Sequence, residues 1–211
     1  MTEFYIFFTF GAPGAGKTTL LKMVEERLGV KHLAAGDLIR EEACKKDSNF
    51  AVQINKCLES GKLIPSEITF SIIEKAINSE LTKTDSIINP KFKKKIFIID
   101  GYPRNKENLD MWNQNMCSKW IIQGGVVFKC NDSICFSRCL SRKNYRSDDK
   151  IWLIYKRIKS FKEETLPIVE QLASNIKIYN VNSEKSEEEV YLELKDRLYN
   201  MGLGDLIEQN T

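Results

Sequence analysis

The sequence lacks the features on which membrane-spanning, secreted and zinc-binding proteins depend. No apolar run approaches the roughly 18 residues of a spanning helix, and the opening residues lack a signal peptide's basic start and cleavage site. The six cysteines show no paired CxxC spacing, which is typical of buried thiols in an intracellular protein. Cys130, Cys135 and Cys139, with His32 as the one histidine, miss the usual zinc spacings. We therefore expect a cytoplasmic protein without a structural metal.

A large excess of charge is also lacking. Lysine and arginine total 32 and aspartate and glutamate 29, which leaves a net charge of +3. Proteins that bind nucleic acid or anionic membranes through a broad basic field carry a larger excess. We therefore expect neither partner, and any basic site must be a local cluster. The length of 211 residues, 42% of them apolar, fits one compact domain with insertions.

Strand-like and helix-like segments alternate along the chain. Short apolar runs predict strands at 5–11, 32–34, 95–100, 125–130 and 176–181. Between them, apolar residues at three- to four-residue spacing predict helices at 17–28, 66–80, 106–117, 132–142 and 148–171. Such alternation favours a parallel sheet with right-handed crossovers, and thus an α/β fold.

Two segments fit the alternation poorly, and a third is a connecting loop. Residues 37–63 carry two short helical patterns that end at Ser60-Gly61, a helix stop, so they look like an insertion. Residues 141–149 are polar apart from Tyr145 and predict an exposed loop between two helices. Residues 82–94 are polar and contain Pro90, which predicts a connecting loop.

One motif indicates phosphate binding. Residues 11–18 read GAPGAGKT, which satisfies G-x-x-x-x-G-K-[ST] and stands between a predicted buried strand and an amphipathic helix. The glycines let backbone N–H groups converge on a phosphate at the helix N-terminus. Lys17 supplies a mobile charge and Thr18 a hydroxyl for magnesium. The alternative is a glycine-rich turn with a solvated lysine, which the strand–loop–helix setting disfavours.

An aspartate and a set of arginines strengthen this interpretation. Asp100 ends a predicted strand, the usual place for the acidic residue that orients magnesium, although a turn aspartate could stand there too. The guanidinium fork suits phosphate oxygens and keeps its charge when desolvated. Each arginine alone could equally be a solvated surface residue, but the set favours a phosphate site. Its members are Arg40, Arg104, Arg138, Arg142, Arg146 and Arg157.

Five segments together resemble the adenylate-kinase-like nucleoside monophosphate kinases. They read GAPGAGKT at 11–18, HLAAGDLIREE at 32–42, ESGKLIPSEIT at 59–69, DGYPRNKENL at 100–109 and YRSDD at 145–149. The resemblance is strongest to the members that phosphorylate UMP and CMP. It implies a five-stranded parallel P-loop NTPase core flanked by helices, with a monophosphate-binding insert and a short lid. The implied single domain has its core at 1–35, 70–140 and 150–211, the insert at 36–69 and the lid at 141–149.

The resemblance also implies the site residues and partners. The implied catalytic residues are Lys17, Arg104, Arg142, Arg146 and Arg157. The implied ATP-binding residues are Ala12, Pro13, Gly14, Ala15, Gly16, Lys17, Thr18, Thr19, Arg138, Arg142 and Lys185. The implied monophosphate-binding residues are Ala35, Arg40, Leu63, Ile64, Gly101, Arg104, Asn108, Arg146 and Arg157. Magnesium enters with ATP at Thr18 and Asp100, directly or through water, and the partners are ATP, UMP and CMP bound to a monomer.

The sequence departs from the family pattern in two places. Thr18 and Thr19 stand where the family has glycine and threonine, so either hydroxyl could serve magnesium, and Leu20 replaces a usual glutamine. The lid is shorter, and Lys143 and Tyr145 replace expected glycines. These departures leave the magnesium hydroxyl and the position of Arg146 open.

The expected reaction needs no general base. The acceptor is a phosphate oxygen whose second pKa is about 6, so it is ionised at neutral pH, and His32 is expected to be a packed residue. Three other functions remain open. An adenylate kinase would act on AMP, a switch protein would read the base with NKEN at 105–108, and a non-catalytic scaffold would only bind nucleotide.

Overall fold

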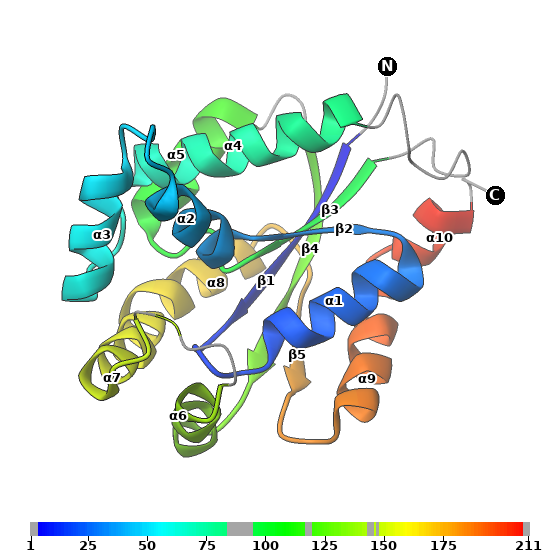
Figure 1. Ribbon diagram of the computed structural model, residues 1–211. Helices are drawn as coiled ribbons and strands as arrows, with labels where there is room; N and C mark the ends of the chain where they lie inside the picture. The colour runs from blue at the N-terminus through cyan, green and yellow to red at the C-terminus, as the bar shows by residue number, and fades with distance from the viewer. Residues whose placement is uncertain (1–3, 84–94, 117–119, 143–145, 147, 209–211) are drawn as a thin grey trace.

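Strands and helices alternate along the chain, as Figure 1 shows. The computed structural model describes residues 4–83, 95–116, 120–142, 146 and 148–208. The strands are β1 (Phe4–Gly11), β2 (Lys31–Ala34), β3 (Lys95–Asp100), β4 (Trp120–Lys129) and β5 (Ile178–Asn182). The helices are α1 (Lys17–Leu28), α2 (Ala35–Cys44), α3 (Ala51–Ser60), α4 (Ser66–Lys83), α5 (Lys106–Met116), α6 (Asp132–Leu140), α7 (Ile151–Ser160), the π-helical turn η1 (Phe161–Thr165), α8 (Leu166–Ala173), α9 (Glu187–Tyr199) and α10 (Leu203–Glu208).

The five strands form one parallel sheet in the order β2-β3-β1-β4-β5. β1 lies at the centre, and its residues 5–10 are all buried because helices cover both faces of the sheet. In the β1–β3 register, Thr9 pairs with Asp100. The loop after β1 therefore begins beside the aspartate that ends β3. This sheet confirms the predicted fold class.

Two apolar clusters hold helices against the two faces of the sheet. On one face, α1, α6 and α9 contribute Leu21, Cys135 and Leu194 to a common cluster with residues of the sheet. On the other face, α4, α5 and α8 contribute residues that include the fully buried Trp112. Because helices cover both faces of the sheet, the carboxyl edge of the strands remains open to the connecting loops.

The segment predicted to be an insertion has a small apolar cluster of its own. Ile39, Ile54, Ile64, Ile68 and Ile72 come from α2, α3, α4 and the α3–α4 connection. Gly61 follows α3 with a φ of 61°, a left-handed conformation that suits glycine. The predicted helix stop at Ser60-Gly61 is thus confirmed. The assignment of 36–69 to monophosphate binding remains a prediction.

The long helix predicted over 148–171 is wrong at its start and in its middle. α7 begins at Ile151, after Lys150 at its N-cap position. The helix then passes through the π-helical turn η1 before α8, which has Pro167 in its first turn. Proline lacks an N–H and its ring clashes with the carbonyl four residues earlier, so a wider turn accommodates it. Helix α6 likewise ends at Leu140, two residues before the predicted end.

Two strands differ from their predicted bounds by two residues or more, and two helices were missed. β4 begins at Trp120 rather than at 125, and a register shift against β1 accompanies the glycines at 124 and 125. A Cβ on Gly125 would lie 2.8 Å from Ile178 Cδ1, so this glycine permits close packing. β5 runs over 178–182 instead of 176–181, and α9 and α10 were not predicted. Most of the loop predicted at 82–94 lies outside the described residues.

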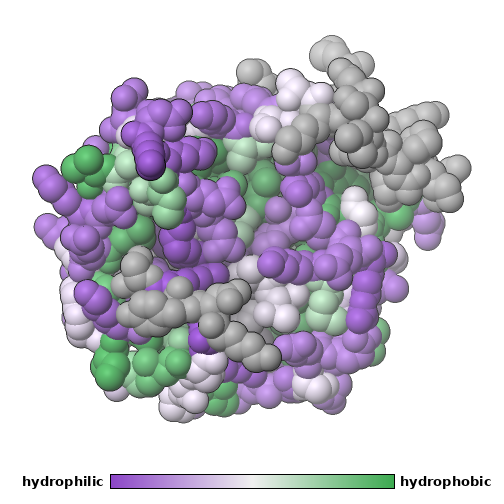
Figure 2. All heavy atoms as spheres, in the orientation of Figure 1, coloured by the Kyte–Doolittle hydropathy of each residue, from purple (hydrophilic) through white to green (hydrophobic). Residues whose placement is uncertain are grey.

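The surface is mostly hydrophilic on the face drawn in Figure 2. Apolar side chains gather over α6 and α7, where Leu140, Ile151, Trp152 and Tyr155 are each at least half exposed. No helix in the described ranges is both long and apolar enough to cross a membrane.

Candidate active site

The loop between β1 and α1 folds around two glycines in the left-handed region. Gly14 and Gly16 have φ values of 86° and 81°, which glycine adopts without the usual steric cost. Gly16 occupies the N-cap position of α1, and the Ala15 N–H donates to the Ala12 carbonyl at 3.1 Å. This curl places the start of α1, with its partial positive charge, at the edge of the sheet. The loop therefore has the geometry of an anion site.

Contact with α6 distinguishes the two glycines. A Cβ on Gly14 would lie 2.0 Å from the Cys135 carbonyl oxygen, whereas a Cβ on Gly16 would meet nothing closer than 3.9 Å. Both alanine variants share the backbone strain, but only Gly14→Ala adds a clash with backbone atoms. We expect Gly14→Ala to lower the thermal midpoint at least about 4 °C further than Gly16→Ala, given roughly 2 kcal/mol of overpacking. Equal shifts in calorimetry would contradict the contact argument.

Lys17 bends back over the loop that precedes it. Its Nζ donates to the Gly11 carbonyl at 2.7 Å and to the Ala12 carbonyl at 3.2 Å. Burial lowers the pKa of this ammonium group, the Asp100 carboxylate opposes that shift, and nearby guanidinium groups reinforce it. The Lys17 charge is thus held against the loop by two of its carbonyl groups.

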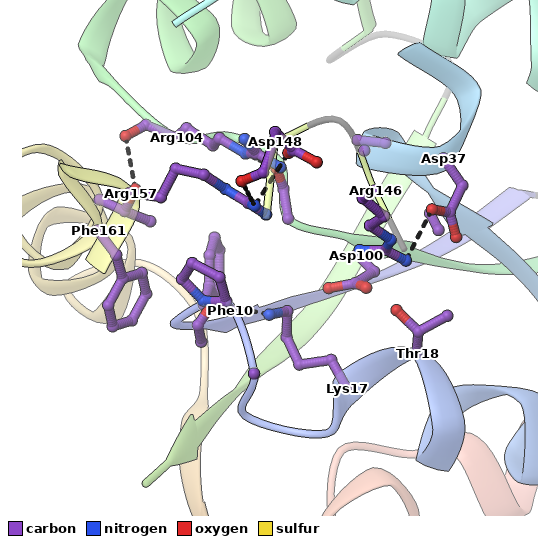
Figure 3. Close-up of a pocket in the computed structure, with 18 of the residues that line it drawn as sticks. Phe10, Lys17, Thr18, Asp37, Asp100, Arg104, Arg146, Asp148, Arg157 and Phe161 are labelled. Atoms are coloured by element: carbon purple, nitrogen blue, oxygen red, sulfur yellow. Dashed lines mark hydrogen bonds and ion pairs between the residues drawn. The ribbon is translucent and has the colours of Figure 1, made fainter. Parts of the chain in front are cut away.

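Asp100 and Thr18 face the same space from β3 and α1 (Figure 3). Asp100 is buried; its Oδ1 accepts from Thr9 Oγ1 at 3.4 Å, and its Oδ2 lies 3.9 Å from His32 Nε2, beyond hydrogen-bond distance. Burial alone would raise the pKa of Asp100, but the charge of Lys17 and the His32 side chain outweigh burial and lower it. Asp100 therefore offers an ionised oxygen to the cavity.

These two oxygen donors fit a magnesium ion that arrives with a nucleotide. Mg²⁺ is bound by one or two protein oxygens together with phosphate oxygens and water. Within the described ranges, no group of three or more His, Cys, Asp or Glu side chains could hold a metal ion alone. Thr18 faces Asp100 in Figure 3, whereas Thr19 is exposed. We propose Thr18 as the magnesium hydroxyl.

Arginines from four parts of the chain converge above the loop, and aspartates separate them. Asp37 pairs with Arg40 and, at 3.1 Å, with Arg146. In the same cluster, Asp148 pairs with Arg157 at 2.9 Å. Asp149 completes the cluster by pairing with Arg142 at 2.7 Å. Arg104 is held by its Nε, which donates to the Gly101 carbonyl at 2.7 Å.

Positive charge predominates around this cluster. Burial and the neighbouring Arg157 lower the pKa of Arg104 to about 10, and burial also lowers the pKa of Arg157. Lys17 and five arginines face four carboxylates, which leaves two positive charges in excess. Guanidinium groups so confined bind phosphate oxygens strongly, because little water competes.

One cavity of about 540 Å³ brings most of the predicted site residues together. The predicted residues that line it are Pro13, Gly14, Gly16, Lys17, Thr18, Thr19, Ala35, Leu63, Ile64, Asp100, Gly101, Arg104, Asn108, Arg138, Arg142, Arg146, Arg157 and Lys185. The predicted residues Ala12 and Ala15 lie buried under the loop instead. Arg40 lies behind the wall, where it pairs with Asp37 and, at 3.6 Å, with Asp148. Lys143 and Tyr145 lie outside the described residues.

Several residues of this cavity were not predicted from the sequence. Asp37 and Asp148 line it and pair with its arginines. Both stand in the segments GDLIR and YRSDD, and a cluster of arginines in a buried site requires counter-charges, so a signal existed. Phe161 and Thr165 also line the cavity from η1, where no local pattern marks them.

Comparisons with known proteins agree with this geometry. The family model described as adenylate kinase matches residues 9–177. A UMP-CMP kinase of Danio rerio is 36% identical over 195 residues, which cover 92% of this chain and 96% of that protein. A UMP-CMP kinase of Homo sapiens is 36% identical over 191 residues, or 90% of this chain and 94% of that protein. UMP-CMP kinase 2 of Caenorhabditis elegans is 34% identical over 190 residues, with 90% and 94% covered.

Proposed function

This chain belongs to the adenylate kinase family, and we propose that it transfers the γ-phosphoryl group of ATP to UMP or CMP, giving ADP and UDP or CDP. Family membership makes it an ATP-dependent phosphotransferase that acts on nucleoside monophosphates. The observation that carries the proposal is the cavity in which a phosphate-binding loop faces a cluster of arginines. Such a cavity can hold two polyanionic substrates end to end.

The transfer depends on charge and alignment rather than on proton abstraction. The acceptor phosphate is ionised at neutral pH and attacks directly, since its second pKa is about 6. Lys17 and the loop amides hold the ATP phosphates, and Arg104 holds the monophosphate from the cavity wall. Arg40 adds its charge from behind that wall, where it pairs with Asp37 and Asp148. Arg142, Arg146 and Arg157 stabilise the charge on the phosphoryl group in transit. Thr18 and Asp100 would hold the magnesium ion, directly or through water, and the ion would supply charge that offsets the phosphates.

The remaining site residues bind the two bases. Arg138 lies beside the loop, where its Nη1 donates to the Ser183 carbonyl at 2.8 Å, and Lys185 also lines the cavity. We place the ATP adenine there. Ala35, Leu63, Ile64 and Asn108 line the cavity at the insert, and we place the monophosphate base among them.

The acceptor is a pyrimidine nucleotide on two grounds. The relatives that match most of the chain are named UMP-CMP kinase. In addition, the residue types at Ala35 and Asn108 resemble those of kinases for UMP and CMP. Adenylate kinases typically have threonine and glutamine at these two positions. A purine that misfits the pocket would leave buried polar groups unpaired, at roughly 1 to 3 kcal/mol each.

We expect UMP and CMP to be at least about tenfold better acceptors than AMP by kcat/KM, which corresponds to about 1.4 kcal/mol. The assay combines the purified protein with ATP and Mg²⁺, follows ADP release with a coupled system, and tests UMP, CMP, dCMP, AMP and GMP. An equal or higher kcat/KM for AMP would contradict the proposed acceptor. ADP release that is the same with and without an acceptor would contradict the transfer itself.

A further inference from the structure

The side-chain amide of Asn108 is held in one orientation. It is buried, and its Oδ1 lies 3.1 Å from the backbone nitrogen of Arg104, which can only donate a hydrogen bond. The atom facing Arg104 must therefore be the oxygen. On the other side, Nδ2 donates to Ser66 Oγ at 2.8 Å. These two contacts leave one N–H of Nδ2 without a hydrogen-bond partner among the described residues, beside the cavity that Asn108 lines.

The hydroxyl of Ser66 is itself oriented by a carboxylate. Ser66 Oγ lies 3.3 Å from Glu107 Oε2, and an ionised carboxylate can only accept. The hydroxyl proton is directed at Glu107, so the oxygen lone pairs are left for Asn108. Hydrogen bonds that run in one direction from Asn108 through Ser66 to Glu107 strengthen one another, and two of these three residues, Asn108 and Ser66, are buried, whereas Glu107 is exposed.

Ser66 reaches this position from another part of the chain. It is the first residue of α4 and belongs to the predicted insert, whereas Asn108 and Glu107 stand in the first turn of α5. Its side chain is buried, and it does not line the cavity. Any effect of Ser66 on a substrate must therefore pass through a neighbour.

We propose that Ser66 is a positioning residue that holds the Asn108 amide toward the base of the monophosphate nucleotide. The inference rests on the proposed function, because it assigns the free N–H of Asn108 to the acceptor's base. Without the Ser66 hydroxyl, the second N–H of the buried amide would lack a partner, which favours rotation of the amide out of its present orientation. The free N–H would then no longer face the base.

The test is a double-mutant cycle with the kinase reaction as the readout. We expect Ser66→Ala to raise the KM for UMP and CMP about tenfold, the size of one lost hydrogen-bonded partner, with kcat and the KM for ATP changed less than about twofold. Ser66→Thr keeps the hydroxyl and should stay within about twofold of the wild type. In the Asn108→Ala background, Ser66→Ala should add less than about twofold, because its route to the substrate has gone.

Two outcomes would overturn the inference. Effects of Ser66→Ala and Asn108→Ala that multiply in the double variant would show that Ser66 acts independently of the amide. A Ser66→Thr variant as impaired as Ser66→Ala would show that the site responds to shape rather than to the hydroxyl. In both cases wild-type transfer to UMP or CMP stays intact, whereas a wild type that phosphorylates neither nucleotide contradicts the proposed function itself.

Discussion

Replacing Lys17 with alanine is expected to lower kcat at least about a hundredfold while leaving the fold intact. The Lys17 ammonium group is held within the loop by two carbonyl groups and faces Asp100 and the arginine cluster. A charge in such a partly desolvated site contributes several kcal/mol to the stabilisation of the transferring phosphoryl group, and each 1.4 kcal/mol is tenfold in rate. The measurement is kcat in the coupled assay at saturating ATP and UMP.

A second lysine provides the matched control. Lys106 is 70% exposed and pairs with Asp110 on the surface of α5, so Lys106→Ala should keep kcat within about twofold. Thermal unfolding of Lys17→Ala should remain cooperative, because no apolar packing is removed. Turnover of Lys17→Ala close to that of the wild type would contradict the proposed mechanism.

Replacing Arg142 with alanine is expected to lower kcat about a hundredfold and to raise the KM for the monophosphate less than about threefold. Arg142 lines the cavity from the segment after α6, where Asp149 holds its guanidinium group at 2.7 Å. We expect the N–H donors of Arg142 to contact charge that develops during transfer. Removing them should therefore raise the free energy of the transition state more than that of the bound substrate. Steady-state kinetics with UMP varied at saturating ATP separates the two constants.

The Arg142→Ala variant also needs a control, because it removes the cation that pairs with Asp149. Asp149 is buried, and without Arg142 the one cation that still pairs with it among the described residues is Arg157 at 3.5 Å, so some stability will be lost. Arg142→Lys keeps a positive charge there, and Arg27→Ala removes an arginine that pairs with Glu188 on the surface. A raised KM with unchanged kcat in Arg142→Ala would assign this arginine to ground-state binding.

The fold was predictable wherever local pattern and tertiary environment agree. The apolar run of β1 and the glycine motif after it predicted strand, loop and helix because both faces of that strand are buried. β4 shows the opposite case. The pattern predicted this strand only from Gly125 onward, but the structure continues it back through Gly124 to Trp120, and both glycines pack closely against neighbouring residues. The turn η1 could not be located, because a π-turn depends on how the helix accommodates Pro167.

The site was predictable in its cations and less so in its carboxylates. Lys17 and the arginines stood in motifs whose chemistry is phosphate binding, and the structure brings all but Arg40 to the cavity wall. Asp148 was missed because an acidic residue beside a predicted phosphate site looks unfavourable until its pairing with Arg157 is seen. Ser66 gave no signal, since a serine after proline indicates only a helix start.

The central claim is that the γ-phosphoryl group of ATP passes to a pyrimidine monophosphate. The most direct test incubates the protein and Mg²⁺ with γ-labelled ATP and equal concentrations of UMP, CMP and AMP, then separates the labelled products at low conversion. Label in ADP can come only from phosphorylation of AMP, so the label reports the acceptor directly. We predict label in UDP and CDP at least about tenfold above label in ADP. Label mainly in ADP, or only in inorganic phosphate, would contradict the account.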